Sequence, residues 1–104
     1  MIGNHKTSVI NNNSITSICY HNTEVVKIKD TSSGKCVILN NGGYYTATTK
    51  RRMNQASKQY GLKFNVFQSD FCWYVGIGNE VVEYHNGIVI DVEHNRISDE
   101  GEWD

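Results

Sequence analysis

Long apolar segments are missing from this sequence. It has no run of about eighteen apolar residues, which argues against a membrane-spanning helix. Residues 1–6 also lack the apolar centre of a secretory signal. We therefore expect no membrane association and a cytoplasmic location.

Cysteine is scarce and unclustered. Cys19, Cys36 and Cys72 lie far apart among apolar neighbours, as expected of small buried side chains in a reducing compartment. No Cys-x-x-Cys pair or His/Cys cluster indicates zinc, and neither a phosphate-binding loop nor an EF-hand is present. Gly76-Ile77-Gly78 lacks the third glycine and the following helix of a dinucleotide loop. We therefore predict no metal and no cofactor.

Charge is unevenly distributed along the 104 residues, a length that corresponds to one domain. The formal net charge is −1, yet residues 91–104 carry six acids and one arginine. Residues 1–90 carry nine Lys or Arg and five acids. This asymmetry predicts a polar N-terminal arm over 1–14, a single α+β domain over 15–92 and an acidic tail over 93–104.

The acidic tail has three interpretations. It could be a solubilising terminus, fold back on the basic part of the chain, or imitate a polyanion towards a partner. Trp103 favours the last two, because an indole prefers an apolar environment to free solution.

One convincing helix is predicted, ending at Gly61. Thr48 or Thr49 is a suitable N-cap, and Gly61 suits a left-handed C-terminal cap. At about 100° per residue, an apolar stripe separates from a polar face. The stripe consists of Met53, Ala56 and Tyr60, and the polar face of Arg51, Asn54, Gln55 and Lys58. Because the stripe is narrow, we expect the helix to lie across a sheet.

Strand patterns surround this helix. Apolar and lysine side chains alternate over 26–29, which indicates a sheet with one polar face. Asn86-Gly87 is the strongest hairpin signal. The predicted strands are 15–20, 23–29, 35–39, 44–47, 62–68, 71–77, 80–84 and 88–92, and Thr7–Ile10 is either an edge strand or part of an unordered arm. We predict an α+β fold, with one helix on a curved, mainly antiparallel sheet in the order β-β-β-β-α-β-β-β-β.

Basic and aromatic residues are interleaved around the helix. Residues 48–63 contain five basic residues and no acid. The candidate contact residues are Lys50, Arg51, Arg52, Lys58 and Lys63, with the aromatic residues Tyr45, Phe67 and Trp73. Such mixtures are typical of single-stranded nucleic-acid binders and of protein interface hot spots. The near-neutral net charge weakens the nucleic-acid interpretation, and a solvated cationic helix face is the simplest alternative.

Catalytic patterns are weak. His21 and His85 occupy two predicted turns, and if these met in space, Glu83 or Asp91 could complete an acid/base site. No histidine lies beside a cysteine or serine in a nucleophile motif. We therefore do not expect an enzyme.

Two stretches, Leu39–Gln55 and Tyr60–Val75, resemble a group of small tailed-phage proteins. Their shared signature is Gly-Gly-aromatic-x-Thr-x-Thr-Thr-Lys-x-Arg-Met-Asn. It is matched by Gly42, Gly43, Thr46, Thr48, Thr49, Lys50, Arg52, Met53 and Asn54. The resemblance extends from about Ile18 to Val75, and it implies action in the cytoplasm of an infected bacterium.

These observations lead to three hypotheses. The first is a non-enzymatic phage protein that occludes a host protein, such as a defence or nucleic-acid-processing factor. The second is direct DNA or RNA binding through the basic helix. The third is a small enzyme built on the turn histidines. The sequence does not indicate an oligomeric state.

Overall fold

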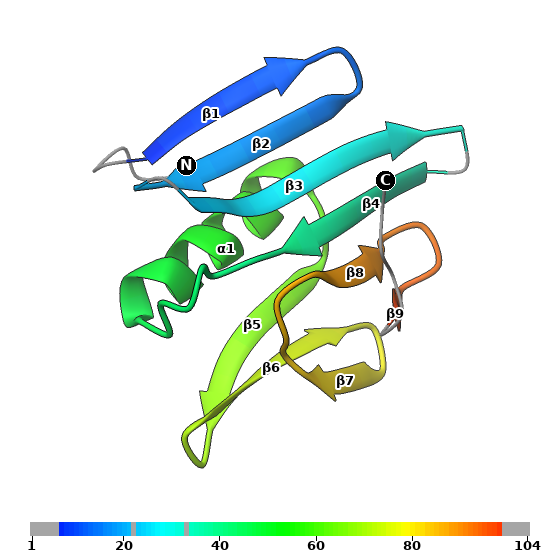
Figure 1. The fold of residues 1–104 in the computed structure, drawn as a ribbon. Coiled ribbons are helices and arrows are strands. Elements are labelled where there is room, and N and C mark those ends of the chain that lie inside the picture. The colour runs from blue at the N-terminus through cyan, green and yellow to red at the C-terminus, as the bar shows by residue number, and fades with distance from the viewer. Residues whose placement is uncertain (1–6, 22, 33, 99–104) are drawn as a thin grey trace.

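Nine strands and one helix make up the part of the chain described by the computed structural model, residues 7–21, 23–32 and 34–98. Figure 1 shows the helix below the N-terminal strands. The three strands that directly follow the helix in the chain lie in the lower part of the view. The elements are β1 (Thr7–Asn12), β2 (Ile15–Tyr20), β3 (Thr23–Thr31), β4 (Gly34–Leu39), α1 (Ala47–Tyr60), β5 (Phe64–Ser69), β6 (Cys72–Ile77), β7 (Glu80–Glu83), β8 (Ile88–Asp91) and β9 (Arg96–Ser98). The expected α+β class is confirmed.

The strands form two antiparallel sheets. One has six strands in the order β1-β2-β3-β4-β8-β9, and the other has three in the order β5-β6-β7. Helix α1 contacts β2 and β3 of the first sheet and β5 of the second. One core therefore joins all three parts, and the helix lies between the two sheets.

The core follows the predicted alternation. Met53 and Ala56 on the helix are completely buried. Beyond the helix, Leu62, Phe64 and Val66 are buried, whereas Lys63 and Asn65 are exposed. The larger sheet contributes Ile18, Val25, Val26, Ile28, Val37, Leu39, Ile88 and Ile90 to the same core.

Asn54 fastens the helix to the edge of β5. Its Nδ2 donates to the Val66 carbonyl at 2.9 Å, and its Oδ1 accepts from the Val66 N–H at 2.8 Å. One turn further on, Ser57 Oγ donates to the Phe64 carbonyl at 2.7 Å. The helix thus takes the place of a neighbouring strand, and these bonds fix which of its residues face outward.

The helix begins earlier than predicted. Thr46 is the N-cap, and its Oγ1 accepts from the Thr49 N–H at 3.2 Å, so the assignment of Thr48 or Thr49 as cap was wrong. The predicted strand at 44–47 is also wrong, because the left-handed Gly42 and Gly43 turn the chain directly into the helix. Gly61, with φ of 66°, is the left-handed cap that was expected.

The hairpin predicted at Asn86-Gly87 is not formed. β7 and β8 belong to different sheets, so this segment carries the chain from one sheet to the other. Asn86 Oδ1 accepts from the Asn41 N–H at 3.0 Å, and the Gly87 N–H donates to the Leu39 carbonyl at 2.9 Å. Asn86 and Gly87 therefore attach the connection between β7 and β8 to the end of β4.

Strands also occur near both ends of the chain. β1 pairs with β2 along its whole length, in accord with the edge-strand alternative for the arm. β9 lies inside the segment expected to be an acidic tail and pairs with β8. Trp103 and the four acids among residues 99–104 lie outside the described residues.

We predict that Asn54→Ala lowers the free energy of unfolding by about 1–3 kcal/mol, because it leaves both backbone groups of Val66 without these partners. The melting temperature should fall by about 4–8 °C for each kcal/mol in a domain of this size. Urea denaturation checks the effect. The control is Asn65→Ala at the neighbouring exposed position of β5, which should stay within about 0.5 kcal/mol of the wild type. Equal losses in both variants would contradict the bridging role of Asn54.

Candidate functional site

The outward face of α1 carries a shallow basic groove. It has a volume of about 380 Å³ and is lined by Ala47, Lys50, Arg51, Asn54, Gln55 and Lys58. Arg51 and Lys58 are exposed, and no acidic residue is among the lining residues. We call these six residues the helix groove. It presents positive charge to solvent through Arg51 and Lys58.

The cations of the helix groove are not neutralised within the described part of the chain. Ion pairs are found at other places in the described chain, for example between Lys35 and Asp30 at 2.7 Å and between His94 and Asp91 at 2.8 Å. Over those same described residues, neither Arg51 nor Lys58 forms an ion pair. Their charges are therefore available to another molecule.

Lys50 is partly committed to the neighbouring hairpin. Its Nζ donates to Gln68 Oε1 at 3.1 Å and lies 5.6 Å from the centre of the Trp73 ring. This contact ties the helix N-terminus to the β5–β6 hairpin. Lys50 therefore contributes charge at one end of the groove but has less freedom than Arg51.

Arg52 faces the protein interior, with only 7% of its surface exposed. Its Nε donates to Thr7 Oγ1 at 3.0 Å, and its Nη1 donates to Gln55 Oε1 at 3.1 Å. The guanidinium also lies 5.6 Å from the centre of the Tyr20 ring, a cation–π distance. Arg52 thus braces the helix against β1 and β2, and it does not belong to the groove.

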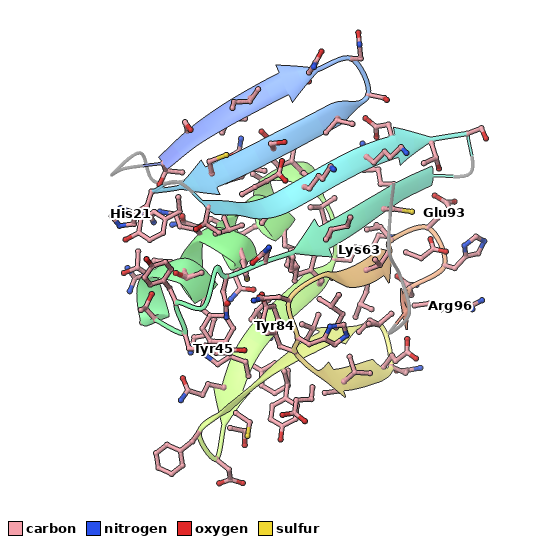
Figure 2. The ribbon with its side chains drawn as sticks, in the orientation of Figure 1. His21, Tyr45, Lys63, Tyr84, Glu93 and Arg96 are labelled. Atoms are coloured by element: carbon pink, nitrogen blue, oxygen red, sulfur yellow. The ribbon has the colours of Figure 1, made fainter. Side chains whose placement is uncertain are left out.

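Most of the candidate aromatic rings pack against one another. Trp73 is 3% exposed, and the Tyr45 ring covers it edge-on at 5.0 Å between centroids. Tyr45 also lies beside Tyr84, at 6.1 Å, as Figure 2 shows. Phe67 is half-buried and stacks on Tyr74 at 5.7 Å. Of these rings, Tyr45 offers the most surface, at 57% exposure.

The remaining candidate, Lys63, lies outside the groove. It follows the C-terminal cap of the helix, is exposed and has a left-handed backbone with φ of 71°. The structure thus brings together Lys50, Arg51 and Lys58, but not Lys63 or the inward-facing Arg52.

An exposed aromatic residue missed by the sequence analysis caps the β5–β6 hairpin. Asp70 and Phe71 form its two-residue turn with φ of 52° and 69°, and Phe71 is 95% exposed. A type I′ turn requires positive φ at both positions, which Asn and Gly adopt most readily. A left-handed phenylalanine costs about 1–2 kcal/mol. Such strain is concentrated at functional sites, and the sequence gives no signal because Asp-Phe is not a favoured turn pair.

The pocket beside His21 does not include the other turn histidine, His85. His21 lines a pocket of about 360 Å³ between the β2–β3 turn and the helix N-terminus, and His85 is not among its lining residues. The lining consists of Tyr20, His21, Thr23, Tyr44, Thr46 and Thr49. Figure 2 shows His21 on the opposite side of the molecule from Glu93 and Arg96.

One carboxyl group and two thiols in the larger sheet have shifted pKa values. Burial alone would raise the pKa of Asp91, but hydrogen bonds from His94 lower it. Burial raises the pKa of the Cys19 thiol, and Glu24 adds to this effect. The Cys36 thiol pKa is raised in the same way, by burial and by Asp91. These thiols therefore favour the protonated, unreactive form.

Over residues 7–21, 23–32 and 34–98, no cluster of His, Cys, Asp or Glu could hold a metal ion. No helix in this part of the chain is sufficiently long and apolar to span a membrane.

We predict that Phe71→Gly raises the free energy of unfolding by about 0.5–1 kcal/mol. Relief of the left-handed conformation, about 1–2 kcal/mol, should exceed the entropic cost of glycine, about 0.5–1 kcal/mol. Urea denaturation measures the difference. Phe71→Leu retains the Cβ atom and should give no such gain. The absence of any gain in the glycine variant would show that the backbone at this turn is unstrained.

Comparison with known proteins places the chain in a family. No curated protein and no solved structure matched it. The family model described as Kyanoviridae Gp96 protein matches residues 2–91, which is most of the chain. The resemblance to small phage proteins is thereby confirmed at the level of a phage protein family. The chain belongs to the Kyanoviridae Gp96 protein family.

Proposed function

We propose that this phage protein is a non-enzymatic binding protein that covers an acidic surface of a host protein. The helix groove makes the charged contacts, and the protein acts by occluding the surface that it covers. The observation that carries this proposal is the exposure of Arg51 and Lys58, unpaired within the described part of the chain.

Charge alone is too weak for such a role. An exposed ion pair contributes about 0.2–1 kcal/mol, whereas micromolar affinity requires about 8 kcal/mol. Apolar contacts must supply the larger part. Tyr44, Tyr45 and Phe71 are 62%, 57% and 95% exposed. Burial of one large apolar side chain contributes about 1.5–3 kcal/mol.

The β5–β6 hairpin connects these two kinds of contact. Gln68 receives the hydrogen bond from Lys50 at the helix N-terminus, and Phe71 follows at the tip of the same hairpin. A partner that reached from the groove to the hairpin tip would meet cations first and then an aromatic ring. Tyrosine, tryptophan, phenylalanine and arginine are the residues that protein interfaces favour.

Direct nucleic-acid binding is the second candidate. Single-stranded nucleic acids stack their bases on open aromatic faces beside cations. Here Trp73 is buried and Phe67 stacks on Tyr74, so these rings offer little free surface. The formal net charge of −1 also opposes association with a polyanion. We therefore rank a protein partner first.

The test is affinity capture from lysate of the host bacterium, with and without nuclease, followed by binding of the purified partner. We predict that Arg51→Glu with Lys58→Glu weakens this binding at least tenfold. The reason is that reversal replaces attraction to an acidic surface with repulsion. Binding by the wild type should also weaken with added salt.

The matched control is Lys63→Glu with Arg96→Glu, which changes the net charge equally at two exposed positions outside the groove. This variant should keep most of its affinity. Equal loss of affinity in both variants would show that net charge alone controls binding. It would contradict the proposed contact at the helix groove. Nuclease-sensitive capture, together with retention of purified protein on DNA or RNA, would favour the second candidate.

A further inference from the structure

The two sheets of the described chain have four edges, formed by β1, β9, β5 and β7. An edge strand presents unpaired N–H and C=O groups that can pair with another chain, and natural proteins cover, charge or shorten such edges. The β5, β7 and β9 edges are covered, charged or short, whereas the β1 edge is not.

The helix covers the β5 edge. The two hydrogen bonds between Asn54 and Val66 occupy one backbone N–H and one carbonyl of this strand. The Ser57 hydroxyl occupies the Phe64 carbonyl. These side chains take the positions that a further strand would use.

The β7 and β9 edges protect each other. Glu80 Oε1 on β7 accepts from the Ile97 N–H on β9 at 2.7 Å. β7 both begins and ends with a glutamate, and β9 has only three residues. Charge and shortness are two of the usual devices against edge pairing.

The β1 edge has none of these devices among the described residues. Its sequence is Thr-Ser-Val-Ile-Asn-Asn, without a charge or a proline. It pairs with β2 through six consecutive residues without a bulge of its own, and five of its six residues are exposed. From Ser8 to Asn12 it is therefore a regular, uncharged edge, the kind that attracts a further strand.

A row of apolar side chains on the helix side of the larger sheet also ends at β1. Val9 lies opposite Ile18, which is completely buried, yet Val9 is 47% exposed. Thr7, two residues before Val9 and so on the same face, contacts Arg52 of the helix. Val9 therefore lies on the helix side of the sheet, and only one of its flanks is covered.

We propose that a second copy of this chain pairs with β1 in antiparallel orientation, so that two six-stranded sheets become one continuous sheet. A two-fold axis perpendicular to the sheet, centred on Val9, sets Val9 against Val9 of the partner. The row that ends at Ile18 and Val9 then continues into the same row of the second copy. Because β1 carries no charge, no like-charge repulsion opposes the pairing.

Light scattering after size-exclusion chromatography of the purified full-length chain tests this proposal. We expect a concentration-dependent dimer, and we expect Val9→Lys to weaken dimerisation at least tenfold by placing two lysines directly opposite each other. Val81→Lys is the matched control, because Val81 is 58% exposed on the protected β7 edge. It should dimerise like the wild type. Far-ultraviolet circular dichroism establishes that each variant is folded.

A cross-linking variant keeps the test decisive even if Val9→Lys fails to fold. Cβ atoms directly opposite each other across two antiparallel strands are about 4.5–5.5 Å apart, close to disulfide range. Under mild oxidation, Val9→Cys should form a covalent dimer, whereas Val81→Cys and the wild type should not. A wild-type monomer up to millimolar concentration would overturn the proposal, as would a dimer that Val9→Cys fails to cross-link. A different polypeptide bound to β1 in place of the second copy would overturn it as well.

Discussion

The hydrogen bonds between Asn54 and the backbone of Val66 hold this architecture together. They attach the helix to the smaller sheet, while Met53 and Ala56 on the neighbouring positions are buried in the common core. An amide can supply a donor and an acceptor at once, so a single side chain replaces a strand at this point. The rotation of the helix follows from this attachment, and with it the identity of the side chains that face solvent.

Two neighbouring arginines show what that rotation decides. Arg52 lies in the interior between Thr7, Gln55 and Tyr20, whereas Arg51 is exposed on the groove. Residues one apart on a helix point about 100° from each other, so one serves the fold and the other remains available for binding. The lack of acids in this stretch has two consequences. It makes Arg52 depend on neutral partners and an aromatic ring, and it leaves Arg51 without an ion pair among the described residues.

The treatment of sheet edges links stability to association. Side chains complete the edges of β5 and β9, so strand pairing ends inside the molecule there. At β1 the same backbone groups face outward beside an exposed valine. The helix groove and β1 consist of different residues, so the proposed host contact and the proposed self-pairing can be tested by separate substitutions.

Local patterns in the sequence predicted much of the secondary structure. Alternation of apolar residues identified the strands after the helix, Gly61 marked the helix end, and the fold class followed from their order. Local patterns extend over a few residues, so they could not show that Asn86-Gly87 joins two sheets. They could not show that β9 forms either, because its partner β8 is needed to align it. Only the tertiary structure showed that Arg52 is buried, that Trp73 lies under Tyr45 and that Phe71 is exposed. Each of these outcomes depends on contacts between residues distant in the chain, whose energies no local pattern contains.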